Sequence, residues 1–429
     1  MDLLRFVTAG SVDDGKSTLI GRLLYDSKAI LEDQLEALER TRHERGEGAL
    51  DLALLTDGLG AEREQGITLD VGYRHFQSRT RRFIIADTPG HLEFTRNMVT
   101  GASTSDLALV LVDVRKGLVD QSRRHASIAA LLRVSAVVFC VNKMDLVGWS
   151  SDAFGCARAD ILRFAKQAGL LQTEVIPLCA LYGDNVVHPS SQMPWYRGPS
   201  LLELLDRFQV ARTLPEPARF PIQYVIGADG ARRSGDRGYA GRMEGGALRV
   251  GDRVSVLPSG FQSRIRAIET FDGPVEVARR GMSVTLRLDD PLEIGRGEWI
   301  CQAEHPARVG LELEAIVCWM AERQALRGER LLLKQMTRTV VARLRAIHSV
   351  LDVSGPGRQA ASLGSSLALN DLAQLSLELA SPIAFDLYRE NRATGSFILI
   401  DERTQATVGG GMIGLPDSGF PTLPGVWQE

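Results

Sequence analysis

Apolar runs alternate with amphipathic stretches along the first half of the chain. Nearly continuous apolar runs, which are typical of buried strands in a parallel sheet, occur at 3–7, 82–86, 107–112 and 136–141. Helical spacing of apolar residues occurs at 18–24, 122–132 and 157–168. The alternation predicts an α/β domain with a mostly parallel sheet and helices on both faces.

The pattern changes after Leu214-Pro215-Glu216-Pro217. Hydrophobic residues then recur with a period of two around 254–256 and 282–288, and turns are expected at 258–260 and 272–274. This is typical of a small antiparallel β-barrel. A second all-β unit is expected from Pro306, because the same alternation returns at 311–314 and 375–379. We predict three domains, at 1–213, 214–305 and 306–429.

Residues 28–66 are too long for a simple connection, and Leu31, Leu35 and Leu38 have helical spacing. This insertion is where a nucleotide-sensing loop could move.

Composition indicates a soluble globular protein. The 429 residues are 44% hydrophobic and 24% charged, and no apolar run reaches the roughly 18 residues of a membrane span. The N-terminus runs directly into the first strand, so we expect a cytoplasmic protein without a leader. The net charge is -3 with both signs interspersed, which disfavours a nucleic-acid partner. We expect no membrane partner either.

Two residue types add detail. The five cysteines, Cys140, Cys156, Cys179, Cys301 and Cys318, have no CxxC spacing and are predicted to be reduced core thiols. Only six of the 50 basic residues are lysine, and Lys16 and Lys143 fall inside candidate nucleotide motifs. A compact ammonium suits those positions better than a guanidinium, although six residues are few enough for coincidence.

A phosphate-binding loop is the main candidate site. The sequence GSVDDGKS lies between a predicted strand and a predicted helix, which is the context that a GxxxxGK[ST] motif requires. Its backbone N–H groups and the helix N-terminus would bind phosphates, Lys16 would contact the outer phosphates, and Ser17 would bind Mg²⁺. The predicted nucleotide-binding residues here are Gly10, Ser11, Val12, Asp13, Asp14, Gly15, Lys16, Ser17 and Thr18.

Two further segments would complete the phosphate and magnesium site. Asp87 follows the predicted strand at 82–86 and would hold Mg²⁺ through water. The turn that it begins continues through Thr88 and Pro89 to Gly90, whose N–H could meet the γ-phosphate. The triplet Gly66-Ile67-Thr68 lies at the end of the insertion, and we predict that Thr68 joins Ser17 on the metal in the triphosphate state. By itself, either segment would be an ordinary turn or loop.

Guanine specificity is predicted at the ends of two later strands. The Asp145 carboxylate can accept from both N1–H and the 2-amino group of guanine, which adenine cannot match. Asn142 would tie this loop to the phosphate loop, and the stem of Lys143 would lie along the base. Cys179, Ala180 and Leu181 follow a strand-like run and would supply a backbone N–H to the guanine carbonyl. His91, directly after Gly90, is the predicted catalytic residue, where an imidazole could orient the attacking water.

These motifs, followed by two barrels, resemble the translational GTPases of the elongation-factor Tu class. Within it, the runs GSVDDGKSTLIGRLLYD, LTDGLGAEREQGITLDVGYR and NMVTGASTSDLALVLVD are similar to those of the GTPase subunits of bacterial two-subunit ATP sulfurylases (sulfate adenylyltransferases). Ser11 and Asp14 are the discriminating positions, because translation factors commonly have histidine at both. Cys179 departs from the family's usual serine, but only a backbone contact is expected there, and Leu92-Glu93-Phe94 also differs in detail.

The resemblance implies a chain that binds GTP, GDP and Mg²⁺ and has a small catalytic subunit as partner. That subunit would make adenosine 5'-phosphosulfate and pyrophosphate from ATP and sulfate, driven by GTP hydrolysis on this chain. Val12 and Ile67 would either restrain His91 or serve only loop packing. Some family members carry a fused adenylylsulfate kinase. Because no second GxxxxGK[ST] occurs, we expect no kinase activity.

Two other functions remain open from the sequence. An elongation-factor-like carrier of tRNA would need electropositive barrel surfaces, and the net charge of -3 gives it little support. A GTP-sensing regulatory switch would bind a partner differently in its two nucleotide states, with turnover incidental.

Overall fold

The protein was analysed as a computed structural model that describes residues 2–29, 52, 71–90, 95–170, 172–209, 216–227, 237–350 and 366–414. The chain forms two compact units, which divide between residues 211 and 212. Each unit has its own buried core.

The first unit is built on a six-stranded sheet with the order β2-β3-β1-β4-β5-β6. All neighbouring pairs are parallel except β2 with β3, so the predicted mostly parallel sheet is confirmed. The central strands β4 and β5 are buried at every residue, as the unbroken apolar runs require. The strands are β1 (Asp2–Gly10), β2 (Gly72–Gln77), β3 (Arg81–Asp87), β4 (Leu107–Asp113), β5 (Ala136–Asn142) and β6 (Thr173–Pro177).

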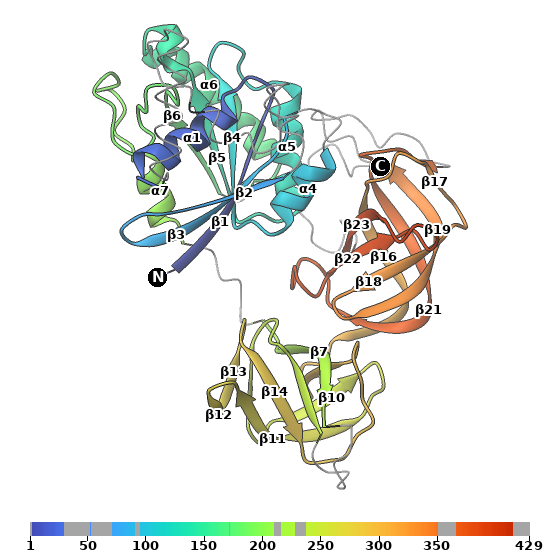
Figure 1. Cartoon of the computed structure of the whole chain (residues 1–429). Helices are drawn as coiled ribbons and strands as arrows, with labels where there is room; N and C mark the ends of the chain where they lie inside the picture. The colour runs from blue at the N-terminus through green and yellow to red at the C-terminus, as the bar shows by residue number, and fades with distance from the viewer. Residues whose placement is uncertain are drawn as a thin grey trace. The chain divides into compact units, whose positions relative to one another are not determined.

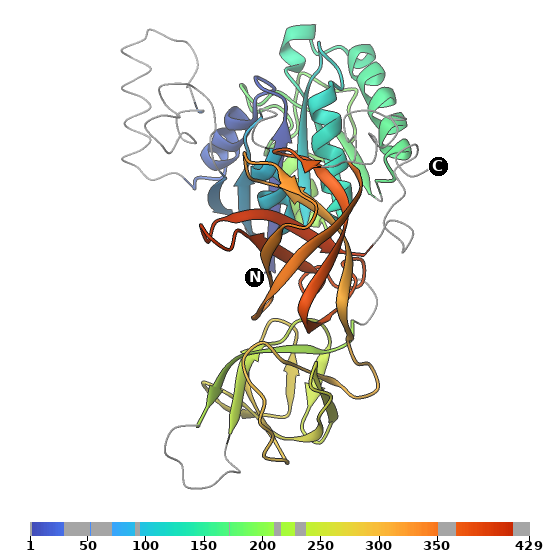
Figure 2. The ribbon, with the colours of Figure 1, turned by 90° about the vertical axis from the view of Figure 1, so that its right-hand side faces the viewer.

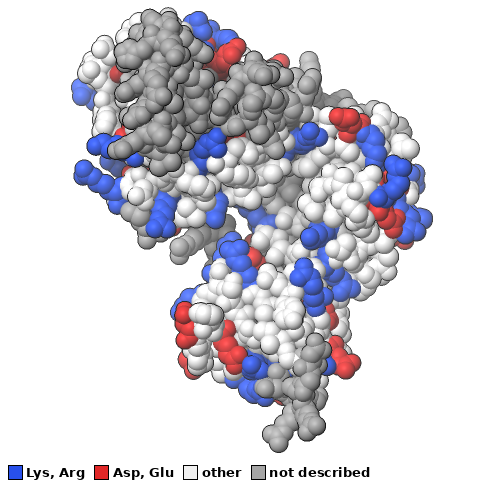
Figure 3. All heavy atoms as spheres, in the orientation of Figure 1, with Lys and Arg blue, Asp and Glu red and all other residues white. Residues whose placement is uncertain are grey.

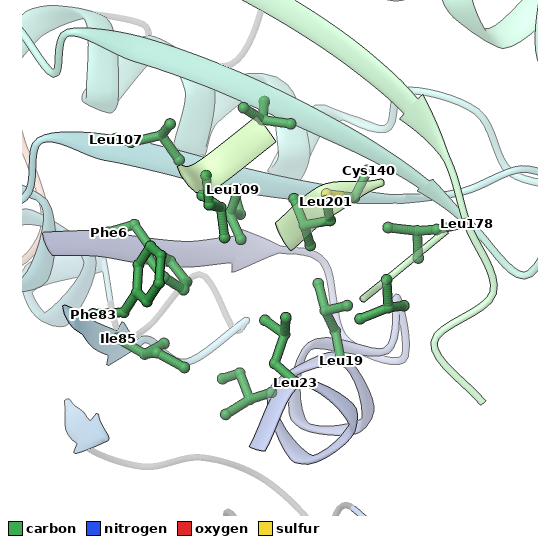
Figure 4. Close-up of a cluster of buried hydrophobic side chains, with 14 of the residues drawn as sticks. Phe6, Leu19, Leu23, Phe83, Ile85, Leu107, Leu109, Cys140, Leu178 and Leu201 are labelled. Atoms are coloured by element: carbon green, nitrogen blue, oxygen red, sulfur yellow. The ribbon is translucent and has the colours of Figure 1, made fainter. Parts of the chain in front are cut away.

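Helices cover both faces of this sheet (Figures 1 and 2). Leucines of α1 and α7 pack with Phe6, Phe83 and Leu109 in one buried cluster (Figure 4). The helices α4, α5 and α6 also contact the sheet strands, but none of their residues belongs to that cluster. They cover the other face of the sheet. The helices are α1 (Lys16–Asp26), α4 (Thr95–Ser103), α5 (Asp120–Leu131), α6 (Ser151–Gln167) and α7 (Leu201–Arg207), and a 3-10 turn η3 spans Met144–Val147.

The second unit begins with an antiparallel barrel. Its sheet has the order β10-β15-β7-β8-β14-β11-β12, and a further pairing of β10 with β11 closes the ring. Alternate residues of β14 are buried, which is the period that the sequence predicts. The strands are β7 (Arg219–Ile226), β8 (Gly238–Arg242), β9 (Ala247–Arg249), β10 (Arg253–Leu257), β11 (Gln262–Thr270), β12 (Gly273–Val275), β13 (Val277–Arg279), β14 (Ser283–Leu288) and β15 (Trp299–Gln302).

A second barrel follows in the same unit, closed in the order β16-β21-β19-β18-β22-β23. The fold is therefore an α/β domain followed by two antiparallel barrels, as predicted. The strands are β16 (Arg308–Trp319), β17 (Ala325–Leu326), β18 (Arg330–Gln335), β19 (Arg338–Val350), β20 (Ser366–Leu367), β21 (Leu372–Phe385), β22 (Ser396–Ile400) and β23 (Thr407–Ile413).

A buried ion pair joins the two barrels. Arg219 of β7 donates to both carboxylate oxygens of Asp386, which follows β21, at 2.8 and 2.9 Å. Arg219 also donates to the carbonyl of His305, and Thr394 donates to Asp386. Both charged side chains are almost completely buried. The charges are paired and hydrogen-bonded, as burial requires.

Two predictions made from the sequence were wrong in detail. Gly273 and Pro274, expected in a turn, form the start of β12, because the chain reverses at Phe271 and Asp272. Four cysteines are buried as predicted, but Cys156 is exposed on α6.

Charged side chains of both signs are interspersed over the second unit on the face seen in Figure 3.

Candidate functional site

The phosphate-loop sequence forms a tight turn between β1 and α1. Gly10, Asp13 and Gly15 have positive φ angles of 144°, 64° and 95°. A Cβ on Gly10 would lie 2.8 Å from the carbonyl oxygen of Leu111, so the turn requires glycine there. The loop leads into the N-terminus of α1 at Lys16, where Ser17 and Thr18 occupy the first turn. This geometry suits an anion.

Ser11 and Asp14, the two discriminating positions, contact each other. The backbone N–H of Ser11 donates to Asp14 Oδ2 at 2.7 Å. Burial raises the pKa of Asp14, and the hydrogen bond from Ser11 opposes that shift. The pair therefore shapes the loop from within.

Lys16 is buried and points back over the loop. Its Nζ donates to the carbonyl oxygens of Ser11 at 2.8 Å and Gly10 at 3.3 Å. Burial lowers the pKa of Lys16, while the charges of Asp87, Asp14 and Asp13 oppose this. A Cβ on Gly90 would lie 2.5 Å from Lys16 Nζ, so the turn after β3 reaches the ammonium group.

Asp87 ends β3 beside the phosphate loop. Thr8 Oγ1 of β1 donates to Asp87 Oδ1 at 2.9 Å, and the two residues are register partners. Thr88 Oγ1 donates back to the Thr8 carbonyl at 2.6 Å, and Pro89 continues the turn to Gly90. The hydroxyl of Ser17 and the carboxylate of Asp87 are hard oxygen ligands, which is the donor chemistry that Mg²⁺ prefers.

Asn142, at the end of β5, joins three segments. Its Nδ2 donates to the Asp14 carbonyl at 2.8 Å, and its Oδ1 accepts from the Ala180 N–H at 2.9 Å. The predicted tie to the phosphate loop is confirmed. The N–H of Cys179 donates to the Asp184 carbonyl, so two of the three backbone donors predicted for guanine have protein acceptors.

The thiol of Cys179 contacts the Asp145 carboxylate. Cys179 Sγ donates to Asp145 Oδ1 at 3.1 Å. Burial raises the pKa of Cys179 to about 12, so the group remains a thiol and keeps its proton for this bond. The sequence argument gave Cys179 a backbone role only, and the structure adds a side-chain contact.

Three residues at the site were missed from the sequence. Asp113, at the end of β4, pairs with Lys143 at 3.1 Å and with Arg115 at 2.7 Å. Burial opposes ionisation of Asp113, but the hydrogen bonds from Arg115 and Lys143 outweigh it and hold its pKa well below its usual range. Lys143 also donates to the Asp13 carbonyl at 2.5 Å. The signal for Asp113 was its place directly after an unbroken apolar run.

The other two missed residues are on helices. Arg22 of α1 donates through Nε to the Ala180 carbonyl at 3.3 Å and through Nη2 to the Leu181 carbonyl, which fixes the predicted guanine loop to the phosphate-loop helix. His125 of α5 is fully buried and accepts from the Gly10 N–H at 3.1 Å. Arg22 lies in the family-like run at 10–26 but outside its phosphate-loop motif, and His125 lies in none of the predicted motifs.

Two family models match parts of the chain. The family model described as "Elongation factor Tu GTP binding domain" matches residues 1–211, and "GTP-eEF1A C-terminal domain-like" matches residues 312–414. Sulfate adenylyltransferase subunit 1 of Laribacter hongkongensis is 50% identical over 417 residues, which cover 96% of this chain and 85% of the relative. The protein of the same name from Cronobacter sakazakii is 48% identical, covering 99% of this chain and 89% of its own. The chain belongs to the sulfate adenylyltransferase subunit 1 family.

A longer relative of the family is also similar. The bifunctional enzyme CysN/CysC of Mycobacterium tuberculosis is 50% identical over 96% of this chain and 67% of its own length.

In this chain, every described candidate residue lies in the range matched by the GTP-binding domain model. No helix in the described ranges is both long and apolar enough to cross a membrane.

Some predicted residues lie outside the described part of the chain. They are Leu31, Leu35 and Leu38 of the insertion, and Ile67, Thr68, His91 and Leu92-Glu93-Phe94. Their roles stay predictions.

Proposed function

We propose that this chain is the GTPase subunit of a sulfate adenylyltransferase. It would bind GTP and GDP with Mg²⁺ and hydrolyse GTP, in support of adenosine 5'-phosphosulfate and pyrophosphate formation from ATP and sulfate. The adenylyl transfer itself would take place on a small catalytic partner subunit in the cytoplasm. Family membership supports the reaction, since the relatives carry its name.

The observation that carries the GTPase part is the meeting of four segments. The phosphate loop, the Asp87 turn, the Asn142 loop and the Cys179 loop follow β1, β3, β5 and β6, and hydrogen bonds link them. In an open parallel sheet, ligands bind beyond the carboxyl ends of the strands.

Each residue then has a separate task. The loop N–H groups and Lys16 would hold the phosphates, and Ser17, Thr68 and Asp87, the last through water, would hold Mg²⁺, which neutralises charge on the transferred group. Asp145 would accept hydrogen bonds from guanine. The Ala180 N–H donates to Asn142 Oδ1, so the guanine carbonyl would either share this N–H with Asn142 or replace Asn142 as its acceptor. His91 would orient the attacking water.

We also propose the division into domains at 1–213, 214–305 and 306–429. It is supported by the separate apolar cores of the two barrels.

The test is pyrophosphate release from ATP and sulfate by the small sulfurylase subunit of the same organism. We expect release and GTP hydrolysis to rise together only when this chain, GTP and the small subunit are all present. Lys16→Ala should abolish both, and Lys166→Ala, an exposed lysine on α6, should change neither. If the wild-type chain alters neither rate, the sulfate-activation function is wrong, and salt-dependent tRNA binding would then favour a carrier.

A further inference from the structure

His125 lies directly beneath the phosphate loop. It is on α5, is 0% exposed, and its Nδ1 accepts from the backbone N–H of Gly10 at 3.1 Å. Gly10 is the last residue of β1, so the imidazole contacts the peptide at which the strand becomes the loop.

This contact fixes the position of the imidazole proton. A nitrogen that accepts a hydrogen bond carries no proton, so a neutral His125 must carry its proton on Nε2. The proton on Nε2 then needs an acceptor. Within the described structure, the hydrogen-bond partner of Nε2 is Gln121, one turn earlier on α5, at 2.9 Å.

Gln121 can supply that acceptor. With its amide nitrogen facing His125, two donors would meet, while Gln121 Oε1 is buried and has no donor among the described residues. Nitrogen and oxygen of an amide are assigned from their hydrogen bonds. A half-turn of this amide places Oε1 against the Nε2–H of His125, which gives both atoms a partner.

The same residue, Gly10, also contacts the phosphate-loop lysine through its other peptide group. Its carbonyl accepts from Lys16 Nζ at 3.3 Å, so Gly10 is held by His125 at its N–H and by Lys16 at its oxygen. The backbone there is at φ 144°, a conformation that is open mainly to glycine. His125 therefore acts on Lys16 through a single residue, Gly10, which joins the two peptide groups that they contact.

Electrostatics keep the imidazole neutral. Burial, together with the positive charges of Lys16 and Arg124, lowers the pKa of His125 to about 3. Protonation would remove the acceptor for Gly10 and would place a second cation beneath the loop. At neutral pH the hydrogen-bond chain from Gln121 to Gly10 is intact.

We propose that His125, oriented by Gln121, is a positioning residue that holds Gly10, and through it Lys16, in the geometry required to bind nucleotide phosphates. The inference rests on the proposed GTPase function, and it adds a support that neither the motif nor the family match identifies.

The test compares GDP with guanosine, which has the same base but no phosphates. Wild type, His125→Leu and His125→Asn are titrated with each, GDP by fluorescence and guanosine by ligand-observed NMR. Leucine offers no acceptor, so GDP should bind roughly tenfold or more weakly, since a buried N–H would lose its partner. The amide oxygen of asparagine can take the place of Nδ1, so that variant should retain most of the affinity. Guanosine binding should be unchanged in both.

The outcomes are distinguishable. If the wild-type chain binds no guanine nucleotide, the proposed function fails first. If wild type binds GDP and His125→Leu binds it equally well, or loses guanosine to the same extent, the positioning role is wrong. Should His125→Leu fail to fold, a comparison of Gln121→Leu with Gln121→Glu tests the same hydrogen-bond chain from Gln121 to Gly10. Only glutamate keeps an acceptor for the Nε2–H of His125. In nitrogen-15 NMR of the wild type, a proton on Nδ1 of His125 would also overturn the inference.

Discussion

Asn142 shows how one amide can organise a binding site. Its two ends bind groups of opposite kind, the Asp14 carbonyl and the Ala180 N–H, so the phosphate loop and the Cys179 loop are set against each other. A carboxylate at this position could accept but not donate. The residue types in the motif are therefore determined by contacts within the protein as well as by contacts with the ligand.

Asp145→Asn should change the base specificity of the site from guanine to xanthine. The substituted amide presents a donor where the carboxylate accepts, and xanthine has a carbonyl where guanine has an amino group. We expect GTP affinity to fall by roughly 100-fold and affinity for the xanthine nucleotide to rise, as measured by competition against a fluorescent GDP. Asp152→Asn, an exposed aspartate on α6, is the control. Unchanged preference for GTP would remove Asp145 from the base site.

Cys179→Ala should weaken GDP binding without affecting the phosphate contacts. The variant loses the 3.1 Å hydrogen bond to Asp145, which is a contribution of about 1 kcal/mol, or roughly fivefold in the dissociation constant. Cys179→Ser keeps a donor and should bind as wild type does. The measurement is GDP affinity by calorimetry, and equal affinities for the alanine and serine variants would show that the thiol contact does not orient Asp145.

At the scale of elements, the sequence predicts what local pattern determines. The strands at 107–112 and 136–141 are read from hydrophobic continuity alone, and β4 and β5 lie at those positions. Helix α6 begins at Ser151, before the predicted start at 157, because the Ser150 side chain caps its polar first turn. His125 and Arg22 could not be predicted, because their partners Gly10 and Ala180 are distant in sequence and meet them only in the folded sheet.

Helix α7 was also not predicted from the sequence. It is short, and a capping box stabilises its N-terminus. Ser200 Oγ accepts from the Glu203 N–H, and Glu203 reaches back to the Ser200 N–H. Ser200→Ala should cost the helix about 1–2 kcal/mol. Hydrogen exchange at 201–207 should accelerate roughly 5- to 30-fold by that cost. Ser151→Ala, an exposed serine in the first turn of α6, should change exchange there by less than about twofold. Unaltered exchange in α7 would mean that packing alone holds it.

At the scale of the whole molecule, the buried Arg219–Asp386 pair is a contact between the two barrels. Arg219→Met leaves a buried carboxylate without its partner, so we expect about 3–5 kcal/mol of lost stability in the second unit. The double variant Arg219→Met with Asp386→Leu removes both charges and should recover most of that loss. Urea unfolding can be followed by tryptophan fluorescence, since Trp299 and Trp319 are both buried in the second unit.

Arg280→Met provides the matched control for this experiment. Arg280 pairs with Glu216 at 2.9 Å, but its side chain is 59% exposed, so the loss should stay below about 1 kcal/mol. If Arg219→Met is no more harmful than Arg280→Met, the buried pair does not hold the barrels together.

Because the thiols differ in burial, a thiol reagent should react with one cysteine of the native protein. Burial raises the pKa of Cys140 and Cys179 to about 12 and that of Cys301 to about 11, and Cys318 is buried as well. Cys156, in contrast, is exposed on α6. A maleimide dye added to the native chain should therefore attach only at Cys156, on the first unit. A dye at that position could report nucleotide binding by fluorescence without any engineered cysteine.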